Sequence, residues 1–209
     1  MTEERLPAWL EWAREIQALS QTGLTYSSNT YETQRYRRLM EIAAEIVHTH
    51  SGLPKDALVE NFLSQPGYAT VKVDVRGAVI QDGRILLVQE RSDELWCMPG
   101  GWADVGRLPS EMVAREVWEE SGFEVSPKRI IGVYDANRSG RPLEFYHAYK
   151  IVFLCDITGG EARPSEETAA VDFFRFDDLP PLSTNRTNRR HLDDVLAHFL
   201  DPCRPVAFD

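Results

Sequence analysis

The chain has 209 residues, of which 43% are hydrophobic, and its formal net charge is −10. This size and composition allow one well-packed core with a smaller appendage. The acidic balance argues against general binding to nucleic acid or to an anionic membrane surface, because both favour a basic protein surface.

The first part of the chain is predicted to be helical. Apolar residues recur at spacings of three and four over residues 6–19 and again over 36–47, which is the period of an amphipathic helix. A polar break is expected over 23–30, and a third, shorter helix over 54–63. Pro66-Gly67 is a turn signal. It predicts a boundary between a helical domain, residues 1–67, and a second domain, residues 68–209.

Beyond this boundary the sequence period changes to two. Valines alternate with polar residues over 71–76, and Asp82-Gly83 predicts a hairpin into the next strand. This order of elements predicts an α/β protein with a mixed sheet and helices on both sides. The later elements expected are strands over 85–89, 123–134, 145–156 and 171–176, and helices over 109–122 and 188–200.

The cysteines and the hydrophobic segments of the chain predict where in the cell the protein is located. Cys97, Cys155 and Cys203 have no metal-ligand spacing and are odd in number, which predicts free thiols in a reduced, cytoplasmic protein. Residues 1–20 mix charged and apolar side chains, unlike a secretory signal. No apolar run reaches the length of a membrane span, so we expect no membrane partner.

The helix expected over 109–122 carries three glutamates that share one face. Glu116, Glu119 and Glu120 have the i, i+3, i+4 spacing of helical neighbours. Crowded carboxylates are unfavourable unless a cation offsets them, and their oxygens suit Mg²⁺ or Mn²⁺. The alternative is a solvated acidic helix face. The pattern predicts a divalent-metal site that handles phosphate.

The same stretch resembles the signature of the Nudix hydrolases, G-x5-E-x7-R-E-U-x-E-E-x-G-U, in which U is a bulky apolar residue. The chain matches from Gly101 to Phe123 at every fixed position except the first glutamate, which is replaced by Arg107. In the family that glutamate helps to hold the motif arginine, here Arg115. Glu111, four residues from both arginines, is the candidate substitute.

The resemblance implies the Nudix α/β/α sandwich over residues 68–200. The helical first part of the chain and the amino-acid sequences of the later strands resemble those of a subgroup with an N-terminal helical domain. This subgroup includes pyrophosphatases of CDP-choline and of ADP-ribose. This subgroup implies a homodimer whose contact is formed by the helical domain, with Trp9 and Trp12 as candidate anchors. It also implies that the helical domain contributes to the substrate pocket.

The resemblance also implies roles for individual residues. Arg115 is expected to orient the cluster by pairing with a carboxylate, with Glu119 one turn on as the candidate partner. A further glutamate from a loop outside the signature is expected as ligand or general base. Glu167 is the first choice and Glu166 the second, and an exposed acidic loop is the alternative. The metal ligands implied are Glu116, Glu120 and Glu119.

Substrate contacts are expected from a glycine turn and from side chains that follow it. Gly100 and Gly101 allow backbone to approach a metal or a phosphate, because no side chain intervenes. Tyr134 is a candidate for ring stacking, Arg138 for phosphate binding and His147 for a ligand contact. Ordinary packing or surface exposure is the alternative for each of these three.

Together these features predict a Mg²⁺- or Mn²⁺-dependent pyrophosphohydrolase. Its expected substrate is a nucleoside diphosphate linked to another moiety, similar to CDP-choline or ADP-ribose. The products would be a nucleoside monophosphate and a phosphorylated second half. The alternative, favoured by Arg107, is a nucleotide-binding or regulatory protein on the same scaffold with weakened catalysis.

Overall fold

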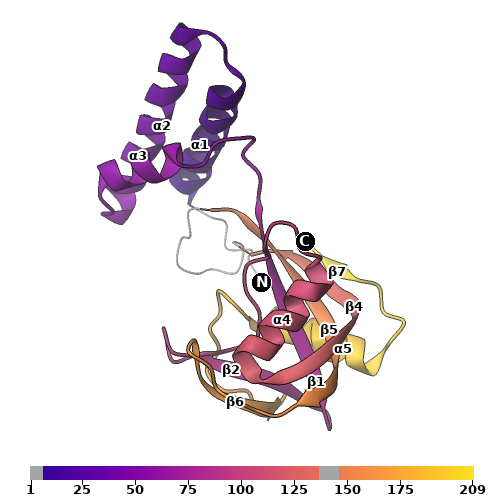
Figure 1. Ribbon diagram of the computed structural model, residues 1–209. Coiled ribbons are helices and arrows are strands. Elements are labelled where there is room, and N and C mark those ends of the chain that lie inside the picture. Colours follow the sequence, from indigo (N-terminus) through magenta and orange to yellow (C-terminus); the bar gives the residue numbers. More distant parts are fainter. Residues whose placement is uncertain (1–6, 137–145) are drawn as a thin grey trace. The chain divides into compact units, whose positions relative to one another are not determined.

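The computed structural model describes residues 7–136 and 146–209 (Figure 1). Contacts divide the chain into two compact units, one of residues 1–71 with 143–147 and the other of residues 72–142 with 148–209. Within the helical unit, the Tyr146 hydroxyl accepts a hydrogen bond from Gln65 Nε2 at 2.6 Å. No helix in the described part of the chain is both long and apolar enough to cross a membrane.

The helical unit consists of α1 (Ala8–Tyr26), α2 (Thr30–Ser51) and α3 (Lys55–Leu63). The helical region before α2 is longer than expected, because Gly23 remains inside α1, where a Cβ would lie 2.4 Å from the Tyr36 ring. The polar break therefore shrinks to residues 27–29. The side chain of Asn29 caps α2 by accepting from the Tyr31 N–H at 2.8 Å. The buried core of this unit contains Met40, Ala43, Ala44 and Phe62.

The other unit is built on a mixed sheet. The strands are β1 (Lys72–Gln81), β2 (Arg84–Glu90), β3 (Trp96–Cys97), β4 (Phe123–Asp135), β5 (Ala148–Gly160), β6 (Thr168–Arg175) and β7 (Ala207–Phe208). Their order in the sheet is β3-β2-β1-β5-β4-β7, and β6 pairs with β2. β1 is antiparallel to β2 but parallel to β5.

Two helices cover the two faces of this sheet, α4 (Pro109–Ser121) and α5 (Arg189–Leu200) (Figure 1). Alternate residues of the strands supply the two cores, as the period of two requires. The arrangement confirms the predicted α/β sandwich. The core under α4 contains Val75, Val79, Leu86, Met112, Val113 and Val117. The core under α5 contains Ala78, Ile85, Leu87, Leu192 and Val195.

The segment that leads to α4 lies between β1 and β2. The two strands pair with each other only next to their hairpin, at Ile80↔Ile85 and Gln81↔Arg84. Beyond that point residues 96–97 pair with β2 as β3, whereas residues 99–103 bond to β1. The glycine turn therefore lies inside the sheet structure, beside Glu116 and Glu120 in the second half of α4.

Candidate active site

The turn at Pro99–Gly101 is fastened to β1 by backbone groups. The Val75 N–H donates to the Gly101 carbonyl at 2.8 Å, and the Gly77 N–H donates to the Pro99 carbonyl at 2.9 Å. Gly100 has a φ of +145°, and a Cβ there would lie 2.0 Å from the Val75 carbonyl oxygen. Residue 100 must therefore be glycine, and the close approach that requires it is to the protein's own strand.

Two of the three signature glutamates face this turn. Glu120 is 6% exposed, and its Oε2 accepts a hydrogen bond from the Gly100 N–H at 2.9 Å. The carboxylate of Glu116 lies beside Gly101, where a Cβ would be 2.8 Å from Glu116 Oε2. The absence of a side chain at residue 101 thus leaves room for a carboxylate next to the backbone.

The two carboxylates lie in an environment that opposes their charge. Burial raises the pKa of Glu120 to about 8, against the effect of the nearby Arg76 guanidinium. Burial also raises the pKa of Glu116, and the negative charge of Glu119 raises it further. A bound cation would relieve this crowding of negative charge.

The third glutamate, Glu119, is held by the signature arginine. Arg115 Nε donates to Glu119 Oε1 at 2.7 Å, as the spacing of four residues predicts, and Arg115 Nη1 lies 3.1 Å from Asp104 Oδ2. Glu111 instead accepts from the Leu108 N–H at 3.3 Å, at the start of α4. The second carboxylate on Arg115 is therefore Asp104, and the expectation that Glu111 takes this place was wrong.

The predicted metal ligands are brought together only in part. Within residues 7–136 and 146–209, no group of three or more His, Cys, Asp and Glu side chains is arranged to hold a metal ion. Glu116 and Glu120 share the turn, whereas Glu119 is bonded to Arg115. The chemistry of the pair still fits a hard divalent cation, because its donors are carboxylate oxygens whose pKa values are raised by burial first and by neighbouring carboxylates second.

The two candidate glutamates outside the signature lie in the turn before β6. The Thr168 hydroxyl ties this turn to α4 by donating to the Glu120 carbonyl at 2.7 Å. Glu166 and Glu167 are both exposed. The negative charge of Glu167 contributes to the raised pKa of Glu116, after burial and Glu119. Glu167 is thus within electrostatic reach of the site.

The predictions for the three substrate-binding side chains, Tyr134, His147 and Arg138, fare differently. Tyr134 is 1% exposed, its hydroxyl donates to Asp194 Oδ2 at 3.0 Å, and the Arg190 guanidinium lies 5.3 Å from its ring centroid. A buried ring of this kind cannot stack on a base, so that expectation was wrong. His147 is half-buried and belongs by its contacts to the helical unit. Arg138 lies outside the described residues.

A buried charged group on β1 and β5 was missed by the sequence reasoning. Arg76 forms two hydrogen bonds with the Asp74 carboxylate, at 2.9 and 2.8 Å, and donates to the Met98 carbonyl at 3.2 Å. Lys150 Nζ lies 3.8 Å from Asp74 Oδ1. Burial alone would raise the pKa of Asp74, but the two cations outweigh it and lower that pKa. The burial of Asp74 and Arg76 could have been predicted, because a central strand of a sheet that is covered on both sides is buried on both faces.

A second missed carboxylate is Glu90 at the end of β2, whose negative charge helps to raise the pKa of Glu120, after burial. Glu90 is 7% exposed, and its Oε1 lies 3.2 Å from Arg186 Nε and accepts from the Cys97 thiol at 3.3 Å. Burial raises the pKa of the Cys97 thiol, so it remains protonated. All three cysteines are free, with Cys97 and Cys155 buried and Cys203 exposed.

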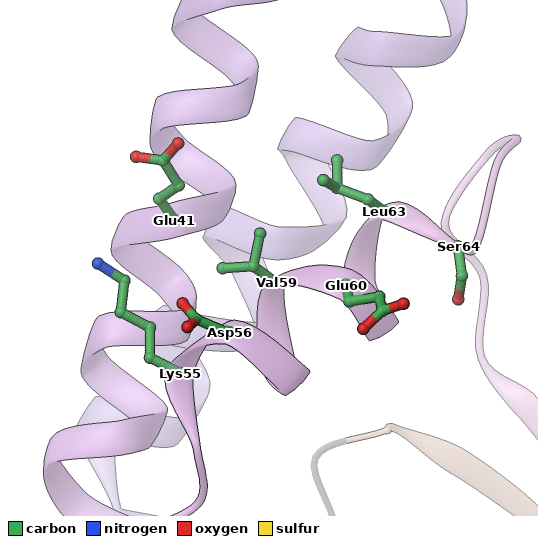
Figure 2. Close-up of a pocket in the computed structure, with 7 residues that line it drawn as sticks. All are labelled: Glu41, Lys55, Asp56, Val59, Glu60, Leu63 and Ser64. Carbon is green, nitrogen blue, oxygen red and sulfur yellow. The ribbon is translucent and has the colours of Figure 1, made fainter.

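The helical unit carries a separate groove, with a volume of about 740 Å³, between α2 and α3 (Figure 2). Three of its lining side chains are acidic, and its one cation, Lys55, lies 2.6 Å from Glu45 Oε1. This groove is unsuited to a diphosphate, because its net charge would repel one. Its lining residues are Glu41, Lys55, Asp56, Val59, Glu60, Leu63 and Ser64.

Comparison with known families agrees with this geometry. Residues 71–195 match the NUDIX domain model, and residues 7–62 match the model described as Nudix_N, the UDP-X-like, N-terminal oligomerisation domain. The chain belongs to the Nudix family and is a pyrophosphatase of that family. The predicted family resemblance is confirmed.

Similar proteins extend over both parts of the chain. The Bacillus subtilis (strain 168) protein named "Putative ADP-ribose pyrophosphatase YjhB" is 38% identical over 201 residues, which cover 96% of this chain and 97% of that protein. A crystal structure of an ADP-ribose pyrophosphatase from Streptococcus suis 89-1591 matches with a TM-score of 0.61 at 38% identity, covering 67% of this chain and all of that one. A structure described as a UDP-X diphosphatase has a TM-score of 0.63 at 29% identity and covers 96% and 98% of the two chains.

Proposed function

We propose that the protein is a divalent-metal-dependent pyrophosphohydrolase that cleaves the diphosphate of a nucleoside diphosphate linked to a second moiety. The observation that carries the proposal is the convergence of Glu116 and Glu120 on the turn at Gly100 and Gly101. One buried and one half-buried carboxylate beside the glycine turn suit a cation that also binds phosphate oxygens.

Each side chain of the site has a task that its contacts support. Glu116 and Glu120, with Glu119 completing the set, would hold Mg²⁺ or Mn²⁺, which supplies charge neutralisation at the diphosphate oxygens when bound. Glu120 is positioned for this by the Gly100 N–H. Gly101 leaves room for the Glu116 carboxylate beside the backbone of the turn.

Proton removal from the attacking water needs a carboxylate that solvent can reach. Glu167 is exposed and within electrostatic reach of Glu116, which makes it the first choice. Glu166, exposed in the same turn as Glu167, is the second choice. Glu119 ranks behind both, because it is only half-exposed and its carboxylate is bonded to Arg115.

The comparisons support a substrate of the ADP-ribose or UDP-X type, since relatives with these names match nearly the whole chain. A CDP-choline-like substrate shares the same reactive diphosphate. The match to an oligomerisation domain over residues 7–62 supports a homodimer.

A substrate panel tests the proposal. ADP-ribose, UDP-glucose and CDP-choline are incubated with the full chain and Mg²⁺, and released monophosphates are quantified. At least one is expected to be hydrolysed, with loss of activity on adding chelator. Glu120→Gln should lower kcat by about 100-fold or more, because it removes a charged ligand.

Glu94→Gln, at an exposed residue, serves as the control for the glutamate exchange. Hydrolysis that persists in chelator and in Glu120→Gln would contradict the proposal. Hydrolysis of none of the three compounds would support the alternative of a nucleotide-binding protein. For an active compound, ¹⁸O-labelled water identifies the phosphorus that is attacked.

A further inference from the structure

Asp104 lies in the loop between Gly101 and α4, and its carboxylate reaches the helix. Asp104 Oδ2 is 3.1 Å from Arg115 Nη1, and the same guanidinium donates through Nε to Glu119 Oε1 at 2.7 Å. One arginine therefore connects a loop carboxylate with a helix carboxylate of the candidate site.

The loop presents Asp104 from an anchored backbone. The Ala103 N–H donates to the Val73 carbonyl at 2.9 Å, so the residue before Asp104 is bonded to β1. The Arg107 N–H then donates to the Asp104 carbonyl at 3.3 Å and closes a turn. Asp104 thus links α4, through Arg115, to a segment that the sheet holds in place.

Glu119 needs such a link to keep its direction. Its negative charge acts on Glu116, so the two carboxylates repel each other. An isolated arginine–glutamate pair on a helix surface is weak, because long exposed side chains lose freedom when they pair. A second carboxylate, that of Asp104, holds the planar guanidinium of Arg115 in one orientation. The guanidinium then holds the Glu119 carboxylate, which is bonded to its Nε.

Arg115 has no carboxylate partner at the signature position of this chain. The family signature has a carboxylate at position 107, where this chain has arginine, and Glu111 is bonded to the Leu108 N–H. Among the described residues, the ion-pair partners of Arg115 are Asp104 and Glu119.

We propose that Asp104 is a positioning residue that sets the direction of Glu119 through Arg115 and takes the place of the carboxylate missing at position 107. The inference deepens the proposed function, on which it rests, by naming a residue on which cation binding and turnover depend.

The test compares the wild type with Asp104→Asn, Glu111→Gln and the double variant Asp104→Asn/Arg107→Glu in the full chain. Glu111→Gln is the matched control, an exposed carboxylate in the same segment that is not bonded to Arg115. Mn²⁺ affinity is measured by calorimetric titration, and kcat and KM on the best substrate of the panel. Exposed ion pairs contribute little to stability, so all variants are expected to fold, which circular dichroism checks.

Asp104→Asn is expected to weaken Mn²⁺ binding about tenfold and to lower kcat by about the same factor, with KM within about twofold, as for other residues that orient metal ligands. Glu111→Gln should match the wild type, and Arg107→Glu should restore most of the loss, because it returns a carboxylate to the signature position. A merely structural role would not predict this recovery.

The proposal is overturned if Asp104→Asn binds Mn²⁺ as the wild type does, if its loss falls only on KM, or if Arg107→Glu restores nothing. A wild type that hydrolyses no compound of the panel would instead overturn the proposed function. In that case the Mn²⁺ titration of the same variants still decides the role of Asp104.

Discussion

At the scale of single residues, the candidate site depends on backbone groups as much as on side chains. The Gly100 N–H positions Glu120, and Gly100 itself fits only because its α-carbon carries no side chain next to the Val75 carbonyl. Without this turn, Glu120 would lose the backbone donor that fixes its carboxylate. The geometry of one glycine is therefore part of the catalytic arrangement.

Gly100→Ala tests this dependence. The added Cβ would lie 2.0 Å from a backbone oxygen at a φ of +145°, so the turn or β1 must move. We expect the free energy of unfolding to fall by about 3 kcal/mol, measured by urea titration, and hydrolysis to drop with it. The control is Gly83→Ala, which has φ +72° and open space around it. It should cost about 1 kcal/mol and leave hydrolysis unchanged. Equal effects of the two substitutions would contradict the explanation.

At the scale of elements, α5 packs on the sheet with a buried histidine among its contacts, because the ring centroids of His191 and of Tyr134 in β4 are 4.6 Å apart. His191, in the first turn of α5, is 2% exposed, and its Nδ1 accepts from the Asn188 N–H at 3.2 Å. Burial, reinforced by the positive charge of Lys150, lowers the pKa of His191 to about 3. The imidazole is therefore neutral in the folded protein at neutral pH.

This histidine predicts a loss of stability in acid. The unfolded chain binds a proton at His191 below about pH 6.5, whereas the folded protein does not until about pH 3. The unfolded state binds more protons in that window, so stability falls as the pH decreases from 6.5. The contribution approaches about 1.4 kcal/mol per pH unit.

His191→Gln removes this contribution while keeping an acceptor for the Asn188 N–H. Urea titrations at pH 5, 6 and 7 should show a shallower fall for the variant than for the wild type, and a constant difference between them above pH 7. Parallel curves at all pH values would show that His191 is not responsible.

Prediction from sequence succeeded for elements with a strong period and failed for contacts made in three dimensions. The alternation over 71–76 and the glutamate spacing in α4 identified β1 and the acidic helix face. The two-residue strands β3 and β7 have no period of their own, because they exist only through pairing with β2 and β4. Asp74 and Arg76 resembled solvent-facing positions of a half-buried strand, but both faces of β1 are covered.

The same distinction applies to the candidate site. The signature predicted Glu116, Glu119 and Glu120, because helical spacing fixes which residues share a face. The choice between Glu111 and Asp104 as partner of Arg115 depended on the path of a loop. Sequence spacing does not encode that path.

At the scale of the whole molecule, the helical unit exposes an aromatic residue that suits an interface. Trp9 stacks on His50 within the unit, with ring centroids 4.7 Å apart, whereas the Trp12 residue is 60% exposed. Exposed tryptophans are frequent anchors of protein–protein contacts. Trp12 is therefore the stronger of the two candidate anchors for the proposed homodimer.

Trp12→Arg is expected to convert a dimer to a monomer in sedimentation velocity, because it places an unpaired charge in an apolar contact. Trp118→Arg, at another exposed tryptophan in α4, should leave the dimer intact. A wild type that sediments as a monomer, or a dimeric Trp12→Arg, would contradict the assignment of the interface.

The bonds between residues 99–103 and β1 have a consequence for altering this enzyme. The partners are main-chain groups, Val73, Val75 and Gly77 on the strand and Pro99, Gly101 and Ala103 opposite them. With glycine kept at residue 100, these bonds do not depend on the side chains of the peripheral loops. Exchanging peripheral loops to admit a different leaving group should therefore leave the turn and the candidate cation site beside it unchanged. Substrate selectivity and catalytic rate can then be altered separately.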